Sequence, residues 1–81
     1  MKLEVRLFAV ARQLVGADSL AVEVPRQATI GQLRAAMARE IPALAPLLSQ
    51  MLFAIGNEYV ADDTVIVAGA DIACIPPVSG G

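Results

Sequence analysis

The sequence predicts a small α+β domain, with a mixed β-sheet of about five strands and one principal helix packed across one face. Three observations support this class. Apolar and polar residues alternate at the start of the chain, a helix start with its own capping residues stands at residue 29, and short apolar runs separated by glycines follow that helix. With 81 residues the chain is long enough for one domain and too short for two.

The first strand is predicted over residues 2–8, because Leu3, Val5 and Leu7 alternate with polar residues. Arg6 should therefore face outward, and Phe8, which breaks the alternation, should point away from the core. Residues 9–15 have the spacing of one or two helical turns, and Gly16 can end them in a left-handed conformation. Alternation returns over residues 20–24, which predicts a second strand that ends at Pro25.

The principal helix is predicted to begin at Thr29 and to run to about Glu40. Thr29 and Gln32 fit a capping box, in which each side chain accepts a hydrogen bond from the other residue's backbone N–H. Apolar residues then recur at intervals of three and four, and Arg34 and Arg39 lie off that face. The residues with this spacing are Ile30, Leu33 and Met37.

The remainder of the chain predicts short elements. Residues 42–51 form an apolar stretch interrupted by prolines, which favours a further short helix. Gly56 and Asn57 can supply the positive backbone angles of a tight turn between two strands, while residues 64–67 are ambiguous between strand and turn. The strands expected here are residues 52–55, 58–60 and 71–75.

The composition points to a protein partner and excludes several classes. The chain is 57% hydrophobic and 17% charged, which is more apolar than ordinary soluble domains. Some of this apolar material should therefore lie exposed, and a contiguous exposed apolar patch usually marks a partner's docking surface. The sequence shows neither a membrane span nor a signal peptide, so a cytoplasmic protein is expected. With no histidine and one cysteine, no metal site is expected.

The charges are unevenly placed along the chain. All six Lys and Arg residues fall within the first 40 positions, and residues 41–81 carry four acidic side chains and no basic one. Nucleic acid is an unsuitable ligand for this half, because phosphate contacts need clustered Lys and Arg. A basic pocket on another protein is the better match.

The sequence divides into a domain, residues 1–75, and an extended tail, residues 76–81. Two prolines should stiffen the root of the tail, and the six residues reach roughly 20 Å when extended, enough to thread a partner's tunnel. A Gly-Gly end fits a narrow channel and leaves the final carboxylate open to a reagent. The chain offers no phosphate-binding loop and no histidine base, so another enzyme must activate that carboxylate. The tail residues are Pro76, Pro77, Val78, Ser79, Gly80 and Gly81.

Three segments carry a resemblance to a known family. The ending IPPVSGG, the stretch LFAVARQLVG at residues 7–16 and the turn AGADIA at residues 68–73 resemble the small subunit of molybdopterin synthase, a family of ubiquitin-like β-grasp sulfur carriers. The similarity covers essentially the whole chain, and PPVSGG is its specific part. One position departs, because members of the family commonly carry two acids after the turn glycine, whereas Ala70 follows Gly69 here.

The resemblance implies a carrier that is not catalytic alone and binds no cofactor. A ubiquitin-activating-type adenylyltransferase would consume ATP to adenylate Gly81, and a sulfur donor such as a cysteine desulfurase or a rhodanese-like protein would then supply the sulfur of a thiocarboxylate. The tail would enter the large subunit of molybdopterin synthase, within a heterotetramer, and sulfur would pass to a cyclic pyranopterin precursor in molybdenum cofactor biosynthesis.

The resemblance also implies a surface that faces these partners. It assigns Phe8, Arg12, Tyr59 and Ile75 to this surface. Ordinary roles are open for each of them: Arg12 as a solvated helix charge, and Ile75 and Tyr59 as core or turn packing. Cys74 is interpreted as an inert buried residue rather than a sulfur-relay thiol.

Other functions are compatible with the same tail. A sulfur carrier of thiamin or amino-acid biosynthesis would use Gly81 in the same way with a different acceptor. A ubiquitin-like modifier would instead be joined through Gly81 to lysines of target proteins, and a plain interaction domain would not use its tail at all.

Overall fold

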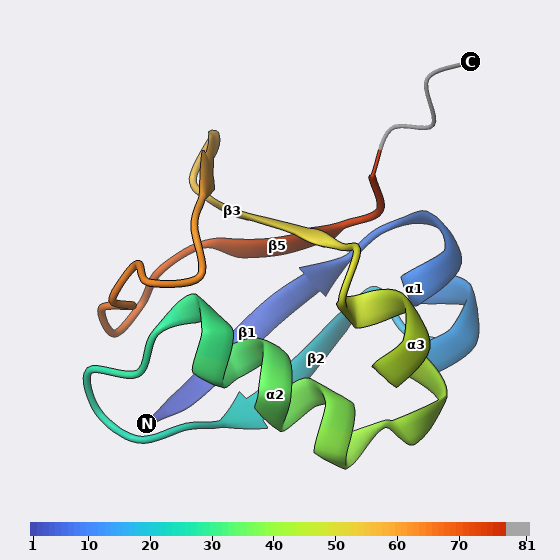
Figure 1. Ribbon diagram of the computed structural model, residues 1–81, viewed down its shortest axis with the longest axis horizontal. Helices are drawn as coiled ribbons and strands as arrows, with labels where there is room; N and C mark the ends of the chain where they lie inside the picture. The colour runs from blue at the N-terminus through green and yellow to red at the C-terminus, as the bar shows by residue number, and fades with distance from the viewer. Residues whose placement is uncertain (78–81) are drawn as a thin grey trace.

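The fold was analysed in a computed structural model, which describes residues 1–77. Figure 1 shows the sheet with the helices gathered on one of its sides. The strands are β1 (Lys2–Leu7), β2 (Ser19–Glu23), β3 (Leu52–Ile55), β4 (Glu58–Val60) and β5 (Ile72–Ile75). The helices are α1 (Ala9–Val15), α2 (Ile30–Glu40), the 3-10 turn η1 (Pro42–Leu44) and α3 (Ala45–Leu48).

The sheet contains five strands in the order β2-β1-β5-β3-β4, and it is mixed as predicted. The first and last strands, β1 and β5, pair in parallel, with Val5 opposite Ile72 and Leu7 opposite Cys74. The other neighbouring strands pair antiparallel. Because β1 and β5 run in the same direction, Phe8 and Pro76 lie at the same end of the sheet.

Helix α2 covers one face of the sheet and begins with the predicted capping box. The Gln32 backbone N–H donates to the Thr29 hydroxyl at 3.2 Å, and the Thr29 N–H donates to the Gln32 side-chain oxygen at 2.8 Å. The apolar stripe of the helix is fully buried. It packs against the inner side chains of β1, β3 and β5, which form one hydrophobic core with it.

Arg34 lies off the apolar stripe of α2, as predicted, and its guanidinium makes contacts that the sequence did not predict. Its guanidinium reaches across the end of α3, where Nη1 donates to the carbonyl of Leu48 and, at 2.8 Å, to that of Met51. Nη2 donates to Asp62 at 2.8 Å. The spacing along the helix correctly excluded Arg34 from the apolar stripe, but it could not show that carbonyl groups from a later segment lie within reach of its long side chain.

Several boundaries differ slightly from those predicted. Strand β1 ends at Leu7, because Phe8 is already the N-cap of α1. Gly16 ends α1 in the left-handed conformation, with φ of 78°, as predicted. At the β3–β4 turn Gly56 alone has a positive φ, of 63°, and Asn57 does not. Residues 64–67 form no strand and contribute a single bridge, between Val65 and Thr29.

None of the helices formed by residues 1–77 combines the length and the apolar character needed to cross a membrane. At the end of the chain, β5 stops at Ile75, and Pro76 and Pro77 belong to no helix or strand. Residues 78–81, which complete the predicted tail, lie outside the described residues.

Candidate functional site

The sheet face opposite the helices carries a row of side chains from four strands. Arg6 on β1 pairs in register with Ala73 on β5, and Ala73 pairs with Ala54 on β3. Ala54 in turn pairs with Tyr59 on β4. Directly paired residues place their side chains on the same face, so these four form one line across the sheet. The middle of this line is a depression in the surface, because both residues there, Ala54 and Ala73, have short side chains.

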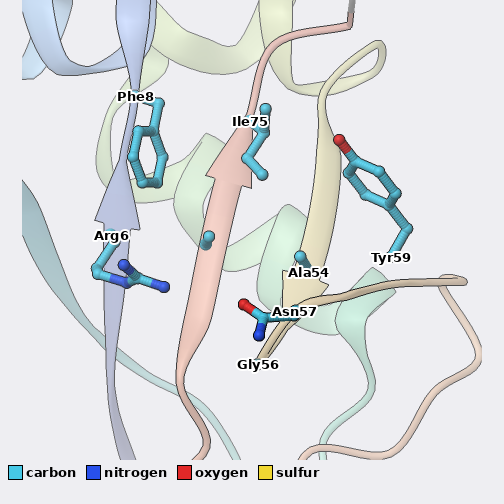
Figure 2. A pocket seen from close by; sticks show the side chains of 8 residues that line it. Arg6, Phe8, Ala54, Gly56, Asn57, Tyr59 and Ile75 are labelled. Atoms are coloured by element: carbon cyan, nitrogen blue, oxygen red, sulfur yellow. The ribbon is translucent and has the colours of Figure 1, made fainter.

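This depression is the floor of a hollow of about 250 Å³. Phe8 and Ile75 stand at one end, and Tyr59 forms the outer wall (Figure 2). Tyr59 is 62% exposed and Phe8 39% exposed, so both rims are available to another molecule. Leu52, which pairs with Ile75 and is 40% exposed, extends the apolar surface beyond the hollow.

The opposite end of the hollow is polar, as Figure 2 shows, with Arg6, Asn57 and Gly56 gathered there. The Arg6 guanidinium is held in a two-pronged ion pair by Asp71, with Nε–Oδ1 at 3.0 Å and Nη2–Oδ2 at 3.1 Å. Its carbon also lies 5.8 Å from the centre of the Phe8 ring. The hollow therefore combines an apolar wall with fixed hydrogen-bond donors, a combination suited to a protein segment.

The structure brings together three of the four residues that the resemblance assigned to the partner surface. Phe8, Tyr59 and Ile75 all line the hollow. Arg12 does not line it: it lies on α1, where its guanidinium is 3.9 Å from the Asp18 carboxylate and both side chains are largely exposed. Such a pair contributes little to stability. The assignment of these residues to an interface remains a prediction.

The tail root is continuous with this face. Ile75 is both the last residue of β5 and a wall of the hollow, and Pro76 follows it directly. The hollow and the root of the predicted tail therefore lie side by side. The predicted tail positions Val78, Ser79, Gly80 and Gly81 fall outside the described residues.

Cys74 faces the opposite way, into the core, as predicted for an inert residue. Its thiol is fully buried and lies 3.6 Å from the sulfur of Met51. Burial raises the pKa of the Cys74 thiol to about 11, and the nearby positive charge of Arg34 only partly opposes this shift. Since the thiolate is the reactive form of cysteine, Cys74 is not equipped to relay sulfur.

Sequence reasoning missed the floor and the polar end of the hollow. Arg6 was assigned to the outward side of β1, which is correct, but the alternation of one strand cannot say which strands lie beside it. Ala54 and Ala73 carry no chemical signal, and they matter only because the register places them next to each other. A pattern of two small residues flanked by large apolar ones would have been the only available clue.

A mixed five-stranded sheet that holds one principal helix, with the last strand at its centre leading into a proline-rooted end, defines a ubiquitin-like β-grasp domain. A model of the ThiS family matches residues 5–81. The chain belongs to the ThiS family.

Characterised relatives of similar length align over nearly the whole chain. The molybdopterin synthase sulfur carrier subunit of Homo sapiens is 35% identical over 83 residues, covering 99% of this chain and 94% of its own length. The protein of the same name from Arabidopsis thaliana is 31% identical over 81 residues, covering 100% of this chain and 84% of its own length.

Solved structures share the fold. SAMP1, small archaeal modifier protein 1, from Haloferax volcanii is 28% identical, with a TM-score of 0.84 and coverage of 100% of both chains. A chain from the protein–protein complex of subunits 1 and 2 of the molybdopterin-converting factor of Helicobacter pylori covers 100% of both chains, with 24% identity and a TM-score of 0.69.

Proposed function

We propose that this chain is the sulfur-carrier subunit of a molybdopterin synthase. The observation that carries the proposal is the full-length similarity to relatives named as such subunits, joined to a sequence that ends in Pro-Pro-Val-Ser-Gly-Gly directly after β5. The fold supplies a rigid support for that end, since β5 is paired on both sides. The chain is then a protein co-substrate and not itself a catalyst.

The reacting group in this proposal is the carboxylate of Gly81. A ubiquitin-activating-type adenylyltransferase joins it to AMP from ATP with release of pyrophosphate. A persulfide on a sulfur donor, such as a cysteine desulfurase or a rhodanese-like protein, then attacks the acyl carbon and displaces AMP, and a thiol reductant cleaves the resulting acyl disulfide. The resulting thiocarboxylate delivers its sulfur to a cyclic pyranopterin precursor in the large subunit.

The open face of the sheet is the docking surface for the large subunit in this proposal. Three features support it: Phe8, Tyr59 and Ile75 present apolar surface around one hollow, the hollow adjoins the tail root, and two alanines form its floor. A heterotetramer would contain two such contacts. Aromatic residues around a desolvated pocket are the usual hot spots of protein interfaces.

A protein modifier is the second candidate, because a modifier protein of Haloferax volcanii shares the fold over the whole chain. In that case the carbonyl carbon of Gly81 would form an amide with a lysine of a target protein. The two functions differ in what the activated end becomes: a thiocarboxylate that is released again, or a conjugate that withstands thiol reductants.

The test is intact-mass analysis of the 81-residue chain after incubation with ATP, a sulfur donor and the activating enzyme from the same organism. Exchange of one oxygen for sulfur at Gly81 is expected. A chain that lacks Gly80 and Gly81 should keep its thermal stability and lose the exchange. Transfer by the shortened chain would refute the proposal, and a covalent conjugate without sulfur exchange would favour the modifier.

The docking surface has its own test, which is the affinity of the large subunit measured by calorimetry. Phe8→Ala should weaken binding at least about tenfold, which corresponds to about 1.4 kcal/mol. Leu14→Ala is the matched control, because Leu14 is 48% exposed and does not line the hollow. Equal losses for both variants would refute the assignment of the interface to the hollow.

A further inference from the structure

A second exposed apolar surface lies at the end of the sheet opposite the tail root. Residues 64–67, named the 64–67 edge here, lie in the connection from β4 to β5. Val65, Ile66 and Val67 line a hollow of about 660 Å³ together with Met1, Arg26, Gln27 and Ala68. Since β1 begins at this end and runs parallel to β5, Met1 and Ile75 lie at opposite ends of the sheet. Figure 1 shows this separation, with the orange connection far from the end of β5.

Some backbone groups of the 64–67 edge are hydrogen-bonded within the domain, and others are not. The Ile30 N–H donates to the Thr64 carbonyl at 3.0 Å, and the Ile66 N–H donates to the Ala28 carbonyl at 2.8 Å. These bonds place residue 65 in the outward-facing position of an antiparallel bridge. Neither the N–H nor the C=O of Val65 bonds to any described residue, and the same is true of the Val67 N–H. The edge therefore offers backbone groups for an added strand.

Its side chains are those of a strand-docking surface. Val65 is 54% exposed and Val67 is 69% exposed, while Ile66 between them is buried and anchors the segment. No charged residue occurs from position 64 to position 70. Proteins usually protect exposed edges with charges, prolines or bulges. An unprotected apolar edge is the arrangement by which an extended segment of another chain is recognised.

The charge beside the edge selects the partner. Arg26 lines the hollow, and its guanidinium makes no ion pair with any residue of the described part of the chain. The other cation there, the Met1 ammonium, is already bound by the Val24 carbonyl at 2.8 Å and lies 3.6 Å from Glu23. The uncompensated charge of the hollow is thus positive, although the whole chain has a net charge of −2.

We propose that the 64–67 edge binds an extended apolar segment of another protein as an added strand, and that an acidic residue of this segment pairs with Arg26. This site is independent of the carrier chemistry at Gly81. Because it lies at the far end of the sheet, a partner bound there leaves the open face and the tail root free. One protein can hold the carrier while another receives its tail.

The experiment uses two synthetic peptides that alternate valine and threonine, one flanked by glutamates and the other by lysines. Backbone amide shifts of the ¹⁵N-labelled 81-residue chain are followed during titration. The glutamate peptide should shift the amides of Val65, Val67 and Gln27 saturably and bind about fivefold more tightly than the lysine peptide. The chain lacking Gly80 and Gly81 should respond identically, so the outcome does not depend on the carrier assignment.

A charge exchange provides the decisive comparison. Arg26→Glu should reverse the preference between the two peptides, whereas Arg39→Glu, at an exposed position outside this hollow, should leave it unchanged. Val67→Asp should abolish binding, and a dispersed amide spectrum verifies that each variant is folded. The proposal is overturned if the shifts gather on Ala54, Tyr59 and Ala73 instead, if neither peptide saturates, or if Arg26→Glu keeps the original preference.

Discussion

The guanidinium carbon of Arg34 lies 4.9 Å from the centre of the Phe53 ring, so a cation from α2 stacks on an aromatic side chain of β3. The same guanidinium donates to the carbonyl groups of Leu48, at the end of α3, and of Met51, and to Asp62 in the loop after β4. One side chain thereby joins the helix, the sheet and two loops. Its Nε has no hydrogen-bond partner among the described residues, a cost that the other contacts must offset.

Replacement of Arg34 by methionine is expected to lower the free energy of unfolding by about 2–3 kcal/mol. Methionine can cover Phe53, but it leaves the Met51 carbonyl without its donor and the Leu48 carbonyl with the Met51 N–H alone, at 3.3 Å. Urea denaturation measures the loss, and Arg39→Met, at an exposed position on the same helix, is the control. Equal stability of the two variants would show that the free-energy cost of burying the Arg34 charge is as large as the stabilisation from its hydrogen bonds.

The thiol of Cys74 is expected to make stability fall with pH above about 9. Its pKa is about 11 in the folded chain, against 9.0 for an exposed thiol. The folded state therefore holds its proton more firmly, so the contribution is complete below pH 9 and is lost as pH rises toward 11. The slope approaches about 1.4 kcal/mol per pH unit in this window.

Denaturation curves of the parent chain and of Cys74→Ala test this expectation. They are measured from about pH 8 to about pH 11, a range that contains both pKa values. The variant starts from a lower stability because of its cavity, but its stability should fall less steeply with pH. Parallel curves would contradict the assignment of the slope to Cys74. Iodoacetamide should likewise modify the thiol slowly in the native protein and rapidly in denaturant.

Local patterns predicted the elements of this fold and did not predict how distant segments meet. The alternation of Leu3, Val5 and Leu7 identified β1, and the capping box identified the start of α2, because both signals lie within a few residues. The hollow depends on the parallel register that sets Arg6 beside Ala73. That register is fixed by the packing of the whole core, for which no short stretch carries a pattern.

The partner surface was predictable to the same extent. Phe8 interrupts the alternation of the first strand, and this break correctly placed it away from the core, where it is 39% exposed. Arg12 has an ordinary helical setting, and its ion pair with Asp18 leaves it outside the hollow. The exposure of Val65 and Val67 could not be predicted. Valine favours a buried strand, and the sequence does not show which segments lie beside these residues.

Thr29→Ala is expected to destabilise the domain by about 1 kcal/mol, since the N–H of Gln32 loses its acceptor. The effect should appear as a shift of the urea midpoint with no change in the slope of the transition. Gln32→Ala removes the other half of the capping box and should cost less, because the Thr29 N–H can then bond to water. A larger loss for Gln32→Ala would contradict this ordering.

An N-terminal extension is expected to lower the thermal midpoint of the domain. The Met1 ammonium is partly buried, and it donates to the Val24 carbonyl at 2.8 Å. A Gly-Ser extension converts this charged amine into an amide, which should cost about 1 kcal/mol and therefore about 4–8 °C in a domain of this size. Calorimetry of the native and extended chains makes the comparison, and identical midpoints would show that this bond is dispensable.

The parallel pairing of β1 with β5 has a consequence for synthesis of the protein. Nearly the whole chain must leave the ribosome before Val5 can meet Ile72, so the centre of the sheet closes last. A nascent or prematurely ended chain lacks Ala73 and Ile75, both of which line the hollow on the open face of the sheet. The hollow therefore forms only once translation has passed β5, because an unfinished copy lacks part of its floor and one of its walls.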